Sequence, residues 1–464
     1  MSKIALIGGG GVRSPLLAFG LNEVRDVIPA EELAIYDVDV ERATLMTRLC
    51  AAVVAVNGGG LRVRVARSIQ DAVEGSAFVL NSIRVGGIAV RARDERLAME
   101  HGYPGQETTG PAGFAMALRT IPVILQQARA VEQYSPQAWF INFSNPAGLI
   151  TQALTGATNL RVVGICDTPT ELFHRIALAF GAQPADVDCE YFGLNHLGWV
   201  RRIRLRGEDV TDRLLSSDSM LRSLYSTELF DPALIRALGL IPTKYLFFYY
   251  AKRTALENQR SAGATRGEEI ARMNSTLISQ LAADLDSKTP QQAVDTYVRY
   301  LNQRSGSYMK LEAMGGSAFA NHSGAEEDPF RSATGYHRIA LDVMQALSSP
   351  RPRRIVVNVR NQGSISDLPA EDIVEVPCLI SSAGAKPQPV GALPDTVRGL
   401  VIAVKAYEKA AIEAALEPSI ERAQLALMLY PAVGEWKPAG DYIQALIQSD
   451  PEHLGYLRGA AAGS

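Results

Sequence analysis

The sequence has few cysteines, no long apolar run and no excess of charge of one sign. Its four cysteines show no Cys-x-x-Cys spacing, which argues against a disulfide framework and for free thiols in a reducing compartment. There is no stretch of about 18 apolar residues, and the apolar segment at 3–7 is too short for a signal peptide, so we expect a cytoplasmic protein without a membrane span. The 46 basic and 49 acidic residues leave a formal charge of −3, which is not the electrostatic footprint of a nucleic-acid-binding protein. Small molecules are therefore the expected partners.

The length of the chain and its hydrophobic pattern indicate two domains. A chain of 464 residues exceeds what one hydrophobic core usually supports. Up to about residue 190, short apolar runs alternate with helical patterns, which is typical of βαβ units in a parallel sheet. Longer helical stretches follow, with a small β element between 362 and 393. We predict an α/β protein with a Rossmann-type doubly wound parallel sheet in 1–190, a mixed α+β domain in 191–440, and a C-terminal helix and tail in 441–464.

A glycine-rich turn at the N-terminus is the first candidate binding site. Gly8, Gly9, Gly10 and Gly11 follow a predicted strand and precede a predicted helix, where a dinucleotide pyrophosphate can approach the backbone closely. Arg13 stands where a strict G-x-G-x-x-G pattern has its third glycine, so a purely structural turn is the alternative. Asp37 ends the second predicted strand, where an acid binds the adenosine ribose and favours NAD over NADP. Together these features predict an NAD site.

Two short motifs 30 residues apart supply a thiol and an imidazole. Cys166 closes an apolar strand, and ligands of open α/β sheets gather at the carboxyl ends of strands. His196 follows Gly193–Asn195 in a polar segment. If the two side chains meet in one cleft beside a nicotinamide, they can hold a metal ion. Taken singly, each is equally explained as a buried structural thiol or a partly buried histidine.

Further polar segments follow other predicted strands. Asn142–Pro146 offers amide side chains to a hydroxylated ligand or to the nicotinamide, although Asn-Pro also initiates ordinary turns. Arg84 and the Arg91–Glu95 segment follow a third strand, and Gln106–Gly110 is an unusually polar loop. A solvated face would account for these charges nearly as well.

Taken together, these motifs resemble glycoside hydrolase family 4, in particular its 6-phospho-β-glucosidase branch. The resemblance runs from residue 3 to about residue 435 and rests on the order of its motifs. They are glycines 8–11, Arg84–Gly87, Arg91–Glu95, Gln106–Thr108, Asn142–Pro146, Cys166–Pro169, Gly193–His196 and Asn358–Pro377.

The resemblance implies a fold like that of lactate and malate dehydrogenases, and glycoside cleavage that departs from the usual two-carboxylate scheme. NAD would oxidise C3 of the sugar, the acidified C2 proton would leave, the aglycone would be eliminated from C1, water would add, and C3 would be reduced again. Cys166 and His196 would bind a divalent metal, usually Mn²⁺, that also holds the C2 and C3 oxygens. Thiolate is a soft ligand and Mn²⁺ prefers hard donors, so residue chemistry alone would favour zinc or iron.

The resemblance also implies the remaining site residues and the assembly. Tyr245 in the segment Lys244–Tyr250 would be the base that removes the C2 proton; Tyr249 is the alternative, and packing of the aromatic segment is a third reading. Asn145 and Arg91 would bind substrate, with help from Arg266. Relatives form dimers and tetramers, so a homodimer or homotetramer is expected.

In two respects the chain departs from the family pattern. Asp167 follows the metal cysteine, where α-specific relatives carry an aspartate as general acid and β-specific relatives an asparagine, so the anomeric preference stays open. Gly9–Pro15 and Met314–Ala320 lack hydroxyl and arginine groups that the phospho-specific branch usually has there. An unphosphorylated or otherwise acidic glycoside, possibly α-linked, is therefore the alternative to a 6-phosphoglucoside.

Two other classes of protein share the N-terminal architecture. A 2-hydroxyacid dehydrogenase would need a catalytic His–Asp pair and an arginine pair for the carboxylate, but not Cys166. A nucleotide-sensing module would bind the cofactor without a metal, and Cys166 together with His196 argues against it.

Overall fold

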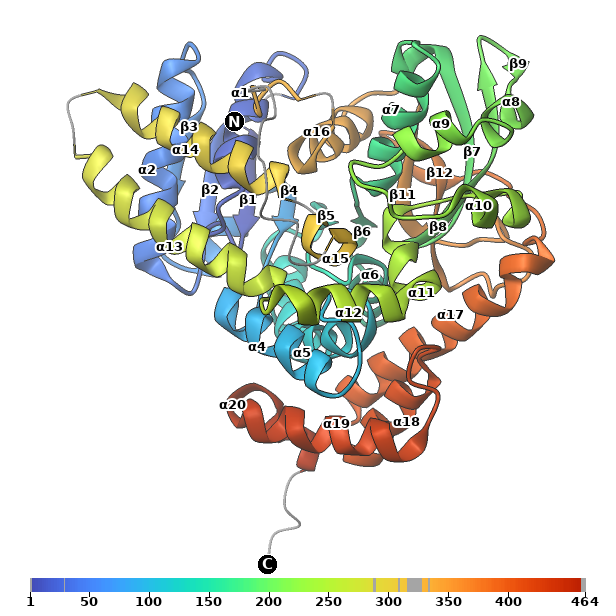
Figure 1. Cartoon of the computed structure of the whole chain (residues 1–464). Helices are drawn as coiled ribbons and strands as arrows, with labels where there is room; N and C mark the ends of the chain where they lie inside the picture. The colour runs from blue at the N-terminus through green and yellow to red at the C-terminus, as the bar shows by residue number, and fades with distance from the viewer. Residues whose placement is uncertain are drawn as a thin grey trace, which may run out of the picture.

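The main element of the fold is a nine-stranded sheet with a Rossmann-type half. The computed structural model describes residues 2–28, 30–286, 289–307, 309–314, 328–332 and 334–459. Six strands run parallel in the order β3-β2-β1-β4-β5-β6. They are β1 (Ser2–Ile7), β2 (Ala30–Tyr36), β3 (Arg62–Val65), β4 (Ser76–Asn81), β5 (Trp139–Asn142) and β6 (Arg161–Gly164). The order reverses between β1 and β4, where such sheets bind their ligands, so the predicted doubly wound α/β sheet is confirmed (Figure 1).

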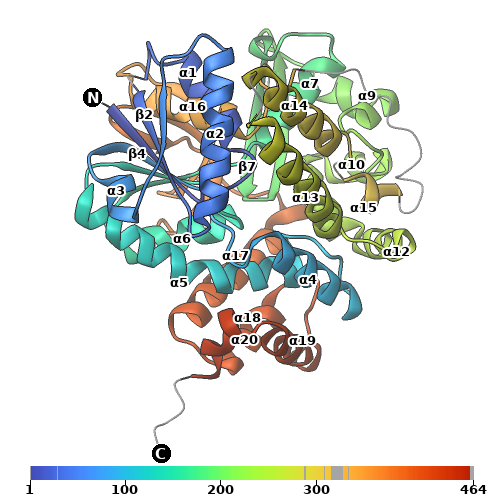
Figure 2. The ribbon, with the colours of Figure 1, turned by 90° about the vertical axis from the view of Figure 1, so that its left-hand side faces the viewer.

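Helices cover this half of the sheet because each connection between parallel strands must cross over it. The first of them, α1, packs on α2 and α16, while α5 packs on α3, α4 and α6. In Figure 2, α13 and α14 run alongside α2. The helices of this half are α1 (Ser14–Glu23), α2 (Val40–Val56), α3 (Ile69–Val73), α4 (Gly87–Glu100), α5 (Gly110–Tyr134), α6 (Ala147–Ala157) and α7 (Thr168–Ala179).

A smaller antiparallel sheet follows, and it contains β7 (Val187–Leu194), β8 (Leu197–Leu205), β9 (Glu208–Asp209) and β10 (Ile241–Pro242). Short helices lie between β9 and β10 in the chain, and further helices follow β10 after a 3₁₀ turn at Lys244–Leu246. They are α8 (Thr211–Leu215), α9 (Asp218–Ser223), α10 (Pro232–Leu238), α11 (Phe247–Tyr250), α12 (Lys252–Ala262), α13 (Arg266–Asp284), α14 (Pro290–Gly306), α15 (Lys310–Met314) and α16 (Tyr336–Leu347).

Three strands from the second half of the chain complete the large sheet. The strands β11 (Arg353–Arg360), β12 (Ile373–Ser381) and β13 (Gly384–Pro387) add to its edge in antiparallel order, and β11 meets β6 at the pair Asn358–Gly164. The predicted β element between 362 and 393 thus corresponds to β12 and β13. The large sheet contains strands from both sides of residue 190. The predicted domain division at that residue stays a prediction.

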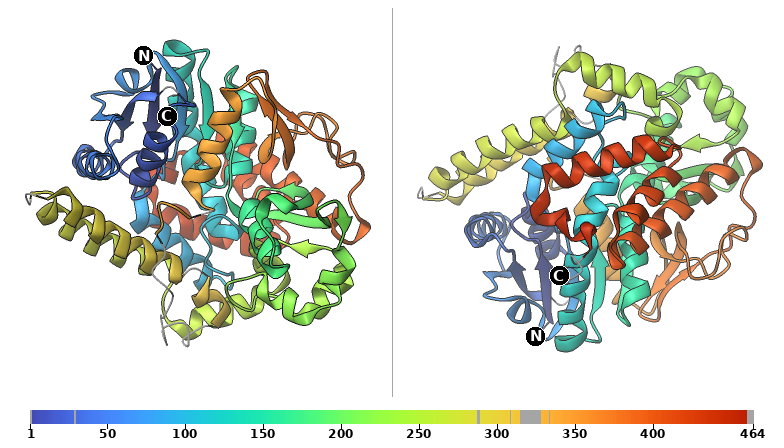
Figure 3. Two further views of the ribbon diagram at one scale, coloured as in Figure 1. Left: turned by 90° about the horizontal axis from the view of Figure 1, so that it is seen from above. Right: turned by 90° about the horizontal axis from the view of Figure 1, so that it is seen from below.

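Four C-terminal helices lie across α4 and α5, as the view from below in Figure 3 shows. They are α17 (Asp395–Leu416), α18 (Ile420–Leu429), α19 (Trp436–Ser449) and α20 (Pro451–Leu454). Arg119 of α5 connects these helices to the rest of the protein, because its guanidinium forms ion pairs with Asp94 of α4 and with Asp450, which precedes α20. The predicted boundary at residue 440 falls inside α19. Among the described residues, no helix is both long and apolar enough to span a membrane.

Candidate active site

The glycine-rich turn after β1 brings the backbone close to a large cavity. Gly8 has a left-handed backbone (φ +82°), and a Cβ placed there would lie 2.6 Å from the carbonyl oxygen of Ser82. The amides of Gly8 and Gly9 donate to the Tyr36 carbonyl, and the amide of Gly11 donates to the carbonyl of Gly8. Glycines at 8 and 9 are therefore required by close contacts inside the protein, since a Cβ on Gly8 would meet the backbone of Ser82 and one on Gly9 would lie 2.5 Å from the Ile35 side chain.

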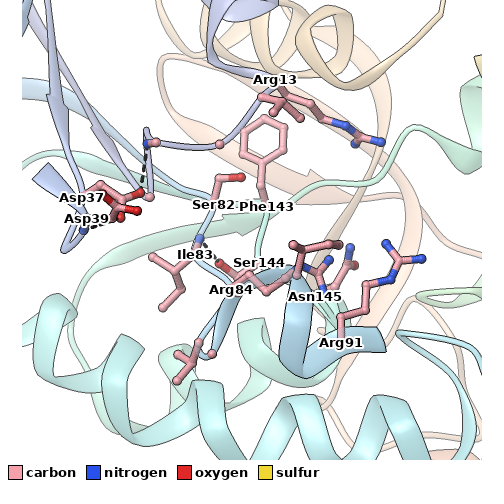
Figure 4. A pocket seen from close by; sticks show the side chains of 18 of the residues that line it. Arg13, Asp37, Asp39, Ser82, Ile83, Arg84, Arg91, Phe143, Ser144 and Asn145 are labelled. Atoms are coloured by element: carbon pink, nitrogen blue, oxygen red, sulfur yellow. Dashed lines mark hydrogen bonds between the residues drawn. The ribbon is translucent and has the colours of Figure 1, made fainter. Parts of the chain in front are cut away.

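Asp37 closes the other end of the turn. Its Oδ2 accepts the amide of Gly10 at 2.9 Å, and its Oδ1 accepts the amide of Asp39 at 3.1 Å. Asp39 in turn caps α2 by accepting the amide of Arg42. Gly8, Gly10 and Asp37 line the same cavity of about 660 Å³, and Figure 4 shows Asp37 and Asp39 at one end of it with Asn145 and Arg91 at the other. This volume lies in the usual range for a small-molecule site.

The loop after β5 is held by hydrogen bonds to the neighbouring strand. Asn142 accepts the amide of Ser144 at 3.0 Å, and the Ser144 hydroxyl donates to Asn81 at 2.7 Å. The same hydroxyl accepts the amide of Ile83 at 2.9 Å. These bonds place Asn145, which follows, on the wall of the large cavity.

Arginines gather around one carboxylate in this cavity. Glu107 pairs with Arg84 and, at 2.8 Å, with Arg91. Burial opposes its ionisation, but Arg84, Arg91, Arg13 and Arg304 outweigh burial and lower the pKa of Glu107 to about 2. Arg13, Arg84, Arg91 and Arg304 all line the cavity, and we call these four residues the arginine cluster. The cluster keeps a net positive charge even with the two carboxylates that pair with it, Glu107 and Glu95, so it can attract an anionic ligand.

The cysteine and histidine predicted as metal ligands lie on different elements next to the sheet. Cys166 follows β6 at the start of α7, and its thiol donates to the Thr168 hydroxyl at 3.2 Å. Burial raises the pKa of this thiol, and the charges of Glu375 and Asp167 raise it further. His196 occupies the turn between β7 and β8, and it is also within the electrostatic reach of Asp167. These three residues lie outside the lining of the large cavity.

The imidazole of His196 has the properties of a metal ligand. The side chain is 4% exposed, and burial lowers its pKa to about 3, so the ring is neutral at physiological pH. Its Nδ1 is buried and has no hydrogen-bond partner in the described part of the chain. A neutral ring with an unused nitrogen fits a metal ion, and a thiol that would lose its proton on coordination fits as the second ligand.

The protein side of this metal site is incomplete by itself. Within the described residues, no group of three or more His, Cys, Asp or Glu side chains is placed to hold a metal ion. Cys166 and His196 would therefore leave coordination positions for substrate oxygens, as a catalytic metal requires.

The two candidate tyrosines face different parts of the molecule. The ring of Tyr245 stacks on the ring of His196, with centroids 3.7 Å apart and planes 22° apart. Tyr249 instead packs against Tyr430, 5.8 Å away, and burial together with Tyr430 raises the pKa of its hydroxyl well above the ordinary value. Only Tyr245 of this pair therefore contacts a predicted metal ligand.

A second, smaller cavity adjoins the first. Arg91 and Glu107 line both cavities, and Tyr245 and Arg266 line the smaller one, whose volume is about 20 Å³. Arg266 is held by Glu269 at 2.5 Å and by the Ser307 hydroxyl at 2.6 Å. The smaller cavity is large enough for about one water molecule.

Sequence reasoning missed two buried carboxyl groups. Glu312 lines the smaller cavity, and its Oε2 has no hydrogen-bond partner among the described residues. Burial raises the pKa of Glu312 to about 7. Glu375 is 1% exposed in β12 and accepts three hydrogen bonds. The signal for Glu375 in the sequence was its place as a single acid between two valines of the strand Ile373–Ser381.

Of the segment Met314–Ala320, which departs from the family pattern, residues 315–320 lie outside the described residues.

The structure brings most of the predicted residues together in two groups, to which Gly9, Cys166 and Asp167 do not belong. One group, with the glycines 8, 10 and 11, Asp37, Asn145 and Arg91, surrounds the large cavity. The other group, with Arg266, Tyr245 and His196, continues from Arg91 through the small cavity and the stacked rings. The assigned roles of these residues stay predictions.

Comparisons with known proteins identify the family. The model of Family 4 glycosyl hydrolase matches residues 3–181, and that of the Family 4 glycosyl hydrolase C-terminal domain matches residues 191–433. The 6-phospho-beta-glucosidase of Escherichia coli (strain K12) is 30% identical over 446 residues, covering 93% of this chain and 91% of that protein.

Solved structures give the same relationship. The 6-phospho-beta glucosidase from Thermotoga maritima, solved with manganese, NAD⁺ and glucose-6-phosphate, has a TM-score of 0.80 at 25% identity and covers 98% of this chain and 99% of its own. A 6-phospho-alpha-glucosidase from gut microorganisms, in complex with NAD and glucose-6-phosphate, has the same TM-score and identity, with 98% of each chain covered.

A more distant likeness concerns the fold alone. The lactate dehydrogenase from Eimeria maxima, solved with NADH and oxamate, has a TM-score of 0.51 at 15% identity over 90% of this chain and 95% of its own. The expected dehydrogenase-like fold is thereby confirmed, and the two family models account for nearly the whole length. The chain belongs to family 4 of the glycosyl hydrolases.

Proposed function

We propose that this family 4 glycosyl hydrolase cleaves a 6-phosphorylated glucoside, with NAD and a divalent metal, Mn²⁺, as cofactors. The observation that carries the substrate class is the arginine cluster, which lines the same cavity as the glycine-rich turn and Asn145. Its four guanidinium groups outnumber the two carboxylates that pair with them, Glu107 and, through Arg91, Glu95. An excess of positive charge favours a sugar that carries a phosphate over a neutral one.

The chain's own residues support each role in the reaction. Gly8 and Asp37 border the space for the dinucleotide, and Cys166 and His196 would hold the metal. When bound, NAD accepts and returns a hydride at C3, and the metal polarises the C2 and C3 oxygens, which makes the C2 proton acidic. Arg91 and Asn145 orient the sugar from the cavity wall.

Proton transfer falls to Tyr245 and Asp167. Tyr245 removes the proton from C2, the bond between C1 and the aglycone oxygen breaks, and Asp167 donates a proton to the departing oxygen. Water then adds at C1 and gives one proton to the Asp167 carboxylate, and Tyr245 returns a proton to C2. The stacking of Tyr245 on His196 supports this choice of base, and the position of Asp167 between Cys166 and α7 supports its role as the acid.

Hydrolysis of paired p-nitrophenyl α- and β-glucosides, each with and without a 6-phosphate, tests the proposal. The assay is run in reducing buffer with NAD and Mn²⁺ as the two additives, and each of these two is omitted in turn. We expect release only from phosphorylated substrates, only with both additives, and without net NADH. Release from unphosphorylated glucosides at the same kcat/KM would refute the role of the arginine cluster, and release without NAD or metal would refute the mechanism.

The same assay decides the anomer. Relatives with either specificity align over nearly the whole chain, and Asp167 matches the α-specific pattern. The variant Asp167→Asn should lose activity most with aglycones that are poor leaving groups, since only these need protonation. A 2-hydroxyacid dehydrogenase would instead convert NAD to NADH in net amounts, and the two glycosyl hydrolase models do not favour that alternative.

We also propose a cytoplasmic location and a homodimer or homotetramer. All four cysteines are free in the structure, which suits a reducing compartment. Light scattering of the purified protein tests the assembly, and a monomer at micromolar concentration would refute it.

A further inference from the structure

Glu375 is a buried carboxylate that joins four elements beside the predicted metal ligands. Its Oε2 accepts the hydroxyl of Tyr191 in β7 at 2.7 Å. Its Oε1 accepts the side-chain amides of Asn195 and Asn358, each at 3.0 Å. Asn358 lies directly opposite Glu375 on β11 and is also the residue through which β11 meets β6, the strand that leads to Cys166. No basic side chain is among these three partners, so the carboxylate is held by neutral donors alone.

Asn195 carries this anchoring to the turn that contains His196. While its amide nitrogen donates to Glu375, its Oδ1 accepts the backbone amide of Ala147 at 3.1 Å. Ala147 begins α6, directly after the Asn145–Pro146 loop. The Asn195 side chain thus connects Glu375, the substrate loop and the β7–β8 turn.

The backbone of His196 needs such support. Its φ of +61° lies in the left-handed region, which residues with a Cβ rarely adopt because the Cβ comes too close to the following carbonyl oxygen. Strained residues of this kind persist only where their surroundings hold them, and they concentrate at functional sites. Asn195 and His196 are the two residues of the turn between Leu194 and Leu197, so an anchor on the first fixes the path of the second.

We propose that Glu375 is a positioning residue that, through Asn195, holds His196 in the conformation in which its imidazole binds the metal. The inference rests on the proposed metal site, to which it adds the residues that hold the ligand His196 in place. Residues behind a metal ligand typically change metal affinity by 10- to 100-fold when they are removed. A carboxylate suits the position because it can accept all three donors at once.

Binding of Mn²⁺, followed by electron paramagnetic resonance without substrate, tests the proposal in the full-length protein. Glu375→Ala should weaken Mn²⁺ binding at least tenfold while the Kd for NAD stays unchanged. Glu375→Gln should restore binding to within about threefold of wild type, because its amide oxygen can still accept Asn195 and Asn358 while its nitrogen donates to the Tyr191 hydroxyl.

A double-mutant cycle identifies the route. Asn195→Ala should weaken Mn²⁺ binding as much as Glu375→Ala, and the double variant should be no weaker than either, since both substitutions break one connection. If Glu375→Ala is too unstable to purify, Asn195→Ala and Glu375→Gln carry the test. Glu32→Ala is the matched control: it removes another buried carboxylate, paired with Arg62 and Arg64 at the far side of the sheet, and should leave Mn²⁺ binding unchanged.

The outcomes separate this inference from the proposed function. If His196→Ala binds Mn²⁺ as wild type does, the metal assignment fails. If His196→Ala loses Mn²⁺ but Glu375→Ala keeps wild-type affinity, only the inference about Glu375 is overturned. Independent, multiplying losses in the double variant, or a Glu375→Gln variant as weak as Glu375→Ala, would also overturn it.

Discussion

Replacing Gly8 with alanine should destabilise the protein and weaken NAD binding, because no space or suitable backbone conformation exists for a methyl group there. A φ of +82° costs an alanine roughly 1–2 kcal/mol. The added Cβ would also lie 2.6 Å from the carbonyl oxygen of Ser82 and 2.8 Å from the amide nitrogen of Ile83. These are backbone atoms, which cannot move aside as the end of a flexible side chain can, and overpacking of this kind costs about 1–3 kcal/mol. The free energy of unfolding should fall by about 2–5 kcal/mol in total.

The effect on NAD follows from where the strain is relieved. The turn lines the large cavity, so a shift of roughly 1 Å to restore ordinary contact distance would move it into the space for the dinucleotide. A loss of at least tenfold in NAD affinity, about 1.4 kcal/mol, is expected. Urea unfolding followed by circular dichroism measures the stability, and isothermal titration calorimetry measures the Kd for NAD.

Gly75→Ala provides the matched control. Gly75 also has a left-handed φ, +71°, but nothing lies within 4 Å of a Cβ placed there. This variant should lose only the conformational cost, about 1–2 kcal/mol, and should bind NAD normally. If Gly8→Ala behaves like Gly75→Ala in both measurements, the argument from close approach is wrong.

Three further substitutions have expected outcomes. Glu107→Gln should lower the free energy of unfolding at pH 7 by up to about 3 kcal/mol. The arginine cluster holds the pKa of Glu107 at about 2, so ionisation stabilises the fold above pH 4.5, and this contribution is lost as pH falls through 2. Equal stability of variant and wild type in urea at pH 7 would contradict this. Glu312→Gln should act in the opposite sense, because burial raises the pKa of Glu312 to about 7. Ionisation therefore destabilises the wild type by up to about 3 kcal/mol as pH rises from 4.5 through 7, and the variant should be the more stable protein at pH 8 but not at pH 4.5. A stability difference independent of pH would contradict this. Tyr245→Phe should abolish exchange of the C2 proton with deuterated solvent while NAD and Mn²⁺ still bind, whereas Tyr249→Phe should keep the exchange; the reverse result would assign the base to Tyr249.

The sequence alone was sufficient for the elements whose pattern is local. The alternation of apolar runs and helical spacing predicted the parallel strands β1, β2, β4, β5 and β6, although not β3. The glycines after the first strand, with Asp37 after the second, predicted where the turn and the cavity lie. Such predictions succeed because burial on a strand or helix repeats with the period of that element. The order of motifs along the chain was enough to predict the family.

Only the tertiary structure decided how distant segments combine. Local pattern indicated a small β element between 362 and 393, but it gave neither β11 nor the completion by β11, β12 and β13 of the sheet begun by the N-terminal half. It shows three tyrosines in one aromatic segment, but not that Tyr245 turns toward His196 while Tyr249 turns toward Tyr430.

Only the tertiary structure likewise decided the pKa values and the partners of the buried carboxyl groups of the site. Glu107 acquires its low pKa from arginines as far away in the sequence as Arg304, and Glu375 meets Asn195 across 180 residues. A residue's own neighbours determine whether it forms strand, helix or turn, and they carry that information in the sequence. Its pKa and its partners depend on which distant groups the folded chain places within a few ångströms, and that depends on the packing of the whole molecule.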